Sequence, residues 1–208
     1  ALAASTDIDP FRMLCDDVEN REQCKFGPTD EPVTYAIIGD SHAAAIRPAI
    51  EYSGLMGNMA GTLYWAGACP LLSGAGMQGQ GTDCLSFKED VWAQIERNSD
   101  LKTIILAGRW PYQVLGSLPE SGGSYTEFLV DAETVTPSAE ENARVFVRGM
   151  VRTLARLEAL GINVIIMGSV PEPGFDVPRT VALSLYAGNP APQGVPRSEV
   201  AARAGIAD

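Results

Sequence analysis

The run Gly39-Asp40-Ser41-His42 combines a nucleophilic hydroxyl with a turn that can expose it. It follows the apolar run 33–38, which is rich in β-forming residues, and it precedes a helical pattern that starts at Ala43. A serine at such a strand-to-helix turn holds its hydroxyl at the carboxyl edge of a sheet. Its backbone N–H lies near a helix start, where developing negative charge is favoured. The pattern therefore allows a functional serine at this edge of the sheet.

The same four residues also fit an ordinary helix start. In that interpretation Gly39 permits a tight turn and Ser41 caps the helix. Spacing alone leaves both interpretations open. The chain offers little other chemistry: His42 is its only histidine, and no Cys-x-x-Cys, Gly-x-Gly-x-x-Gly or P-loop spacing occurs. We therefore expect no metal site and no bound cofactor.

Four cysteines form two local pairs, Cys15 with Cys24 and Cys69 with Cys84. Four cysteines allow three pairings, of which we expect the local one. Each such disulfide would stabilise the fold by about 2–3 kcal/mol, because it restricts the unfolded chain. Disulfides would also indicate an oxidising compartment, either the periplasm or the cell exterior. Four buried free thiols are the alternative.

Composition bounds the class of protein. The chain has 208 residues, of which 46% are hydrophobic and 20% charged, with a formal net charge of −11. These values are typical of globular proteins and exclude a disordered chain. The apolar runs are shorter than about ten residues, too short to span a bilayer. An acidic chain without basic clusters is not expected to bind nucleic acid or anionic lipids.

Apolar strands alternate with helical patterns along the chain. This order predicts an α/β fold with three layers, α/β/α, around a mostly parallel sheet. Long loops follow the strands at the carboxyl edge of the sheet, where open α/β sheets bind ligands. The expected strands are 33–38, 62–65, 103–107 and 163–167. The expected helices are 11–20, 43–53, 87–97, 138–160 and one that starts at residue 198.

Several details accompany these elements. Pro48 should delay or bend the helix around it. Ser86 and Ser138 should begin their helices as N-caps in capping boxes. Residues 111–137 should form a long loop. The helix 138–160 should bury an apolar stripe, which comprises Val145, Val147, Met150, Val151, Leu154, Leu157 and Leu160.

Taken in order, four features resemble the SGNH (GDSL-like) hydrolase superfamily, and most closely the SGNH domain fused to membrane acyltransferases of family three. They are the Gly39-Asp40-Ser41-His42 block, Cys69-Pro70 after the second strand, Arg109-Trp110 after the third strand, and Cys24 before the first. The resemblance covers roughly residues 24–170. It implies an SGNH-hydrolase fold of the flavodoxin-like type.

The resemblance also implies roles for individual residues. Ser41 would be the nucleophile that forms an acyl-serine, with Asp40 and His42 in support. The N–H groups of Ser41 and Gly67 would stabilise the oxyanion. The Asn that the superfamily uses as a third donor is absent, so Arg109 or a backbone N–H would replace it, or the oxyanion hole would be weaker. Arg109 and Trp110 are substrate-site candidates; a surface ion pair and a packing role are the alternatives.

The general base is the main departure from the family. The family places Asp-x-x-His near its carboxyl end, and this chain has no histidine after His42. His42 is a poor substitute, because a base must lie within about 3 Å of the hydroxyl and neighbouring side chains at a turn diverge. We therefore expect an irregular N-terminal segment, 1–32, tied by a disulfide, and an SGNH-like domain, 33–208, without its Asp-x-x-His block.

The function implied by the resemblance is O-acyl transfer, in particular acetyl transfer, to a cell-surface or secreted glycan. The partners would be a glycan acceptor, an acyl donor and a membrane acyltransferase domain in the same polypeptide. The domain would then be extracytoplasmic and tethered to the inner membrane. An extracytoplasmic carbohydrate esterase and a non-catalytic glycan-binding module on the same scaffold are the alternatives.

Overall fold

A computed structural model describes residues 9, 14–15, 24–53, 55–79, 82–116, 127–170, 177–190, 194 and 196–198. Contacts divide the chain into two units, Ala1–Gly168 and Ser169–Asp208. In the second unit, helix α7 spans Val177–Tyr186. The helix expected over 11–20 and most of the one expected from residue 198 lie outside the described residues. None of the helices among the described residues is long and apolar enough to cross a membrane.

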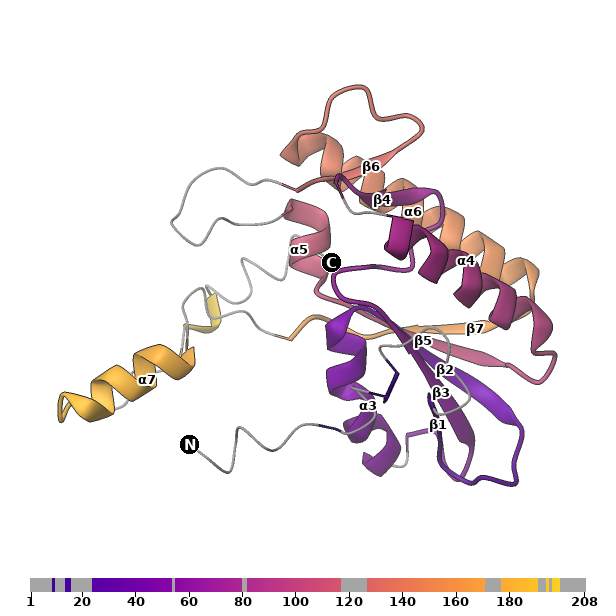
Figure 1. Cartoon of the computed structure of the whole chain (residues 1–208), viewed down its shortest axis with the longest axis horizontal. Coiled ribbons are helices and arrows are strands. Elements are labelled where there is room, and N and C mark those ends of the chain that lie inside the picture. Colours follow the sequence, from indigo (N-terminus) through magenta and orange to yellow (C-terminus); the bar gives the residue numbers. More distant parts are fainter. Residues whose placement is uncertain are drawn as a thin grey trace. The chain divides into compact units, whose positions relative to one another are not determined.

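The first unit is built on a five-stranded sheet of order β1-β3-β2-β5-β7 (Figure 1). All neighbouring strands run parallel except β1, which pairs antiparallel with β3. The mostly parallel α/β sheet predicted from the sequence is therefore confirmed, with β1 as an additional edge strand. The strands are β1 (Lys25–Phe26), β2 (Val33–Gly39), β3 (Ala60–Trp65), β5 (Thr103–Ala107) and β7 (Asn163–Ile166).

Helices cover both faces of this sheet (Figure 1). Helix α3 (Ser41–Ser53) lies on one face, and α4 (Thr82–Arg97) and α6 (Ala139–Ala159) lie on the other. Side chains alternate along a strand, so Tyr35 and Ile37 of β2 pack with Ala43 and Ile50 in the core beneath α3. The fully buried Ile38 points to the opposite face. Burial on both faces explains why β2 is almost continuously apolar.

Two helices begin earlier than the sequence predicted. Helix α3 starts directly at Ser41 and contains Pro48, so Pro48 does not delay the helix. Helix α4 starts at Thr82, which places Ser86 inside it, and the capping box predicted at Ser86 is wrong. The helix therefore starts one turn upstream of the predicted cap.

Helix α6 begins as predicted but buries only part of the predicted stripe, including Val145 and Leu157. The Ser138 hydroxyl accepts a hydrogen bond from the Glu141 N–H at 3.1 Å and caps the helix. Val147 and Val151, expected in the core, are exposed. The loop before β4 packs closely on Gly149, where an added Cβ would lie 3.1 Å from Leu72. The residues buried on α6 are Asn142, Val145, Gly149, Thr153 and Leu157.

The region 111–137, expected to be a loop, contains two regular elements. Helix α5 spans Trp110–Leu115, and strand β6 (Leu129–Asp131) pairs antiparallel with β4 (Ala75–Met77). Both are held by the fully buried Asn142 of α6. Its side chain donates to the backbone carbonyl of Gln113 at 2.9 Å and accepts from the Leu129 N–H. One buried amide therefore joins α5, β6 and α6.

Candidate active site

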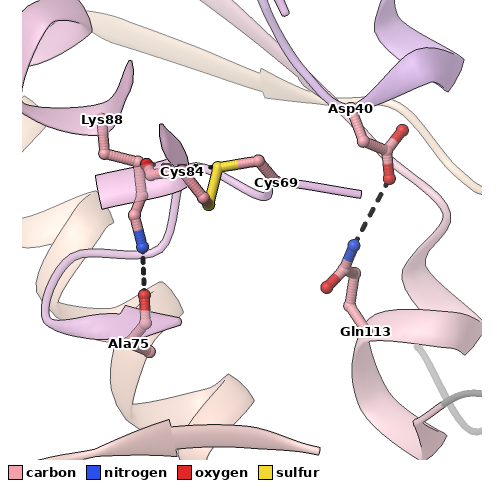
Figure 2. Close-up of a disulfide and its surroundings, with 6 residues drawn as sticks. All are labelled: Asp40, Cys69, Ala75, Cys84, Lys88 and Gln113. Carbon is pink, nitrogen blue, oxygen red and sulfur yellow. Dashed lines mark hydrogen bonds between the residues drawn. A yellow bond between two sulfur atoms is a disulfide. The ribbon is translucent and has the colours of Figure 1, made fainter. Parts of the chain in front are cut away.

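Both local cysteine pairs form disulfides, Cys15–Cys24 and Cys69–Cys84. The second bridge ties the loop after β3 to the first turns of α4 (Figure 2). The pairing is the local one expected from the spacing, and no cysteine is free. The loop at the carboxyl end of β3 is therefore anchored to a helix that covers the sheet.

The register of the sheet brings three candidate residues to the same edge. Gly39 pairs with Trp65 of β3 on one side and with Ala107 of β5 on the other. Ser41, Gly67 and Arg109 each follow this row of paired residues by two positions. The three residues, although far apart in sequence, therefore lie just beyond the same edge of the sheet, the carboxyl edge at which α/β proteins bind ligands.

Gly39 is required because β5 approaches it closely. A Cβ built at Gly39 would lie 1.7 Å from the carbonyl oxygen of Ala107. The backbone φ of Gly39 is not in the left-handed region; the glycines with a positive φ lie elsewhere in the chain. The sequence argument gave conformational freedom as the reason for this glycine, and that reason is wrong. The strands must meet here so that the turns that follow them are adjacent.

Asp40, and not Ser41, is the residue that caps helix α3. Its Oδ1 accepts a hydrogen bond from the His42 N–H at 2.8 Å, and its carbonyl accepts from the Ala43 N–H at 2.9 Å. These contacts are typical of an N-cap. The carboxylate is buried, with 2% of the residue exposed. The interpretation of Ser41 as the cap is therefore wrong, and Ser41 occupies the first helical position.

The second carboxylate oxygen of Asp40 reaches the turn after β5. Oδ2 accepts from the Arg109 N–H at 2.8 Å and from the Gln113 side-chain amide at 3.4 Å (Figure 2). Asp40 therefore joins the β2–α3 turn to the β5–α5 turn. Gln113 is fully buried and was missed from sequence; its position one helical turn after Arg109 was the only signal.

Ser41 lies at the amino end of α3 with its backbone amide unengaged. Within the part of the chain that the structure describes, no group accepts a hydrogen bond from the Ser41 N–H. Ser41 is half-buried, so it lies at the boundary between the core and solvent. Because the helix dipole favours negative charge at this end, the amide is suited to stabilise an oxyanion.

The His42 imidazole does not contact the Ser41 hydroxyl. Its Nδ1 is buried and has no hydrogen-bond partner among the described residues. The backbone N–H of His42 is bound by Asp40, which fixes the residue in the first turn of α3. No hydrogen bond joins the His42 imidazole to the Ser41 hydroxyl among the described residues.

The remaining candidates divide into exposed and buried positions. Gly67 is exposed, and a Cβ there would meet no atom within 4 Å. Arg109 is also exposed, with its guanidinium carbon 5.4 Å from the centre of the Tyr112 ring. Trp110 is buried; its Nε1 donates to the Met167 carbonyl at 2.6 Å. Its ring also packs edge-on against Phe146. Trp110 therefore has a packing position, whereas Gly67 and Arg109 face the solvent side of the edge.

No group of three or more His, Cys, Asp or Glu that could hold a metal ion occurs among the described residues. The groups that the geometry brings to this edge are the Ser41 hydroxyl, the amides beside it and the exposed Arg109 guanidinium. Burial raises the pKa of the nearby Tyr112 hydroxyl, and the carboxylate of Glu127 adds to that shift. Tyr112 is therefore a neutral hydrogen-bonding group beside Arg109.

A three-layer α/β unit with a serine at its first strand-to-helix turn is the architecture of SGNH-type domains. The chain belongs to the family described as "SGNH domain (fused to AT3 domains)", which it matches over residues 8–208. A solved structure of the lipopolysaccharide acetyltransferase periplasmic domain of Salmonella ser. Paratyphi A is similar, with a TM-score of 0.59 and 14% sequence identity. That match covers 97% of this chain and 75% of the Salmonella one. No curated protein sequence matches the chain significantly.

Proposed function

We propose that this chain transfers an acyl group, most simply acetyl, to a hydroxyl of a cell-surface or secreted glycan through an acyl-serine at Ser41. The observation that carries the proposal is the placement of Ser41 at the first position of α3 with an unengaged amide. The family description supports acyl chemistry. The Salmonella structure, whose title names a lipopolysaccharide acetyltransferase, supports a glycan as acceptor.

The reaction would proceed in two halves. In the first, the Ser41 oxygen attacks the carbonyl carbon of the donor, the Ser41 proton goes to a base, and the donor's leaving group departs with a proton. In the second, a glycan hydroxyl gives its proton to the same base and attacks the acyl-serine, the ester bond to Ser41 breaks as the new ester forms, and the base returns the proton to the Ser41 oxygen. The amides of Ser41 and Gly67 would stabilise the oxyanion in each half. Arg109 would contact substrate at the same edge.

The acyl donor and the location follow from the family and from the disulfides. Because members are described as fused to AT3 domains, we assign the delivery of the acyl group to a membrane acyltransferase domain in the same polypeptide. Two disulfides favour an oxidising compartment. The domain would then be extracytoplasmic and tethered to the inner membrane.

A second candidate is a non-catalytic glycan-binding module. The observation that favours it is the lack of a base hydrogen-bonded to Ser41 among the described residues, since a serine hydroxyl depends on an adjacent base for activation. The two candidates differ in whether a covalent acyl-serine forms. An esterase would form the acyl-serine and pass the acyl group to water.

The test uses the whole protein that carries this chain, expressed in cells that lack their own copy. The O-acetyl content of the envelope glycans is measured by NMR for wild type, Ser41→Ala and the control Ser99→Ala. Ser99 is exposed in the loop before β5, at the opposite end of the sheet. We expect Ser41→Ala to lose O-acetylation and Ser99→Ala to keep it, with the wild type carrying an acetyl group on Ser41 by mass spectrometry.

Full O-acetylation in Ser41→Ala would refute the assignment of Ser41 as the nucleophile. Glycan binding without any acetyl on Ser41 would favour the binding module. Acetyl release into water without transfer to the glycan would favour the esterase.

A further inference from the structure

A cavity lies on the loop between β3 and α4, which leaves the sheet at the candidate active-site edge. It has a volume of about 470 Å³, within the range of roughly 300–1,000 Å³ usual for small-molecule sites. Three elements line it: the segment 73–77 around β4, one face of α4, and Arg156 of α6. The same loop carries Gly67 at its start and is anchored by Cys69–Cys84 (Figure 2).

Lys88 is the unusual residue in this cavity. It projects from α4, is only 7% exposed, and donates a hydrogen bond from Nζ to the Ala75 carbonyl (Figure 2). No carboxylate pairs with it among the described residues. An ammonium group carries three donors, so two remain to serve a ligand or water. A buried ammonium without a counter-charge destabilises a fold, and burial lowers the pKa of Lys88.

The other walls would suit a sugar ring. Leu72, Met77 and Trp92 are apolar residues that line it, and Glu89 is an exposed carboxylate that can accept hydrogen bonds from hydroxyls. Arg156 lies with its guanidinium carbon 4.1 Å from the centre of the Trp92 ring and forms an ion pair with Glu96. Its charge is therefore already compensated, and Lys88 is the cation that a ligand would neutralise.

We propose that this cavity binds an acidic sugar, with the carboxylate or phosphate of the sugar on the Lys88 ammonium and its ring against the apolar wall. The proposal rests on the proposed function only in taking the sugar to be part of the glycan acceptor. Anchoring an acidic residue of the glycan here would hold the chain on the β3–α4 loop, which leaves the sheet at the end of β3. The cavity would then select glycans that carry negative charge.

The test is a binding titration of the protein with four probes: glucuronate, glucose 6-phosphate, glucose and inorganic phosphate. We expect both acidic sugars to bind, and the amides of residues 73–77 to shift in NMR spectra. Glucose should bind much more weakly because it offers Lys88 no charge. Lys88→Met should weaken the acidic sugars by about thirtyfold or more. The control Lys102→Met, at an exposed lysine before β5, should leave binding unchanged.

Three results would overturn the proposal. Equal binding of glucose and glucuronate would show that no charge is recognised. If inorganic phosphate binds as tightly as glucose 6-phosphate, the cavity recognises an anion and does not recognise the sugar ring. No shift of residues 73–77 in the wild type would show that the sugar does not bind here.

Stability separates a binding role from a structural one. If Lys88 is kept for a ligand, Lys88→Met should melt at the wild-type temperature or higher, because a buried uncompensated charge is removed. A lower melting temperature with no wild-type binding would make Lys88 structural. Ser41→Ala serves as the second control: it should abolish transfer and keep acidic-sugar binding, so that failure of either proposal is recognised separately.

Discussion

Replacing Asp40 tests whether one buried carboxylate holds the two turns of the site together. In Asp40→Asn, the remaining oxygen can still accept from the His42 N–H, since Asn caps helices as well as Asp. The Arg109 N–H, now 2.8 Å from a carboxylate oxygen, would instead face an NH₂ group. A hydrogen bond to a charged acceptor contributes about 1.5–3 kcal/mol, and that is the expected loss in the free energy of unfolding.

Asp40→Ala should cost more, because it removes the cap as well. Loss of an N-cap adds about 0.5–2 kcal/mol, which brings the expected total to about 2–5 kcal/mol. Urea unfolding followed by circular dichroism measures both variants, with the slope of the transition as a check that unfolding remains two-state. The matched control is Asp100→Asn, at an exposed loop position, which should change stability by less than about 0.5 kcal/mol. If Asp40→Asn is as stable as that control, the carboxylate does not join the turns and the reasoning fails.

Three further changes test the scaffold. Gly39→Ala should lower stability by at least about 3 kcal/mol or prevent folding, because its Cβ would meet the Ala107 carbonyl; a native melting curve would contradict this. Asp131→Asn should cost about 1.5–3 kcal/mol near neutral pH, because Arg148 holds the pKa of Asp131 far below its ordinary 3.8. That difference should persist above pH 3.8 and shrink as the pH falls below it; a pH-independent difference in urea titrations would refute it. Cys84→Ser should cost about 3 kcal/mol by opening a bridge between cysteines 15 residues apart, and an unchanged unfolding midpoint would show that the bridge restricts nothing.

The long apolar segments were predictable from sequence, and the short ones were not. Strand β5 has the predicted bounds because a short, nearly continuous apolar run fills a strand buried on both faces. Strands β1, β4 and β6 have two or three residues each, too few to show a period. Helix α5, which begins at Trp110, was predicted as part of a loop because it is short and is followed by Gly- and Ser-rich residues.

Candidate residues were predictable where chemistry is local and not where it depends on distant contacts. The Asp-Ser pair was found because it follows a strand. That Asp40 also joins this turn to the turn after β5 depends on a partner 69 residues away, Arg109. Asn142 was likewise missed, because a polar residue on a helix gives no sign that it will meet the backbone of Gln113, 29 residues earlier. The stripe predicted for α6 is confirmed at Val145 and Leu157, which are buried, and is wrong at Val147, Val151 and Leu160. The hydrophobic period alone does not show that a loop packs on Gly149.

The contacts of Asp40 determine which amide at the site is left available. At the start of α3 the first N–H groups have no intrahelical partner, and Asp40 accepts the one from His42. Its other oxygen accepts from Arg109, which removes that amide from the same edge. The Ser41 N–H is then the amide in this turn that keeps a free hydrogen for a ligand among the described residues. A negative carboxylate so close to an oxyanion would oppose its formation, unless its charge is taken up by the donors it binds and by the helix dipole. The fold meets that condition by burying Asp40 among three donors, so the oxyanion that we propose at the Ser41 N–H would form beside a carboxylate whose charge is compensated.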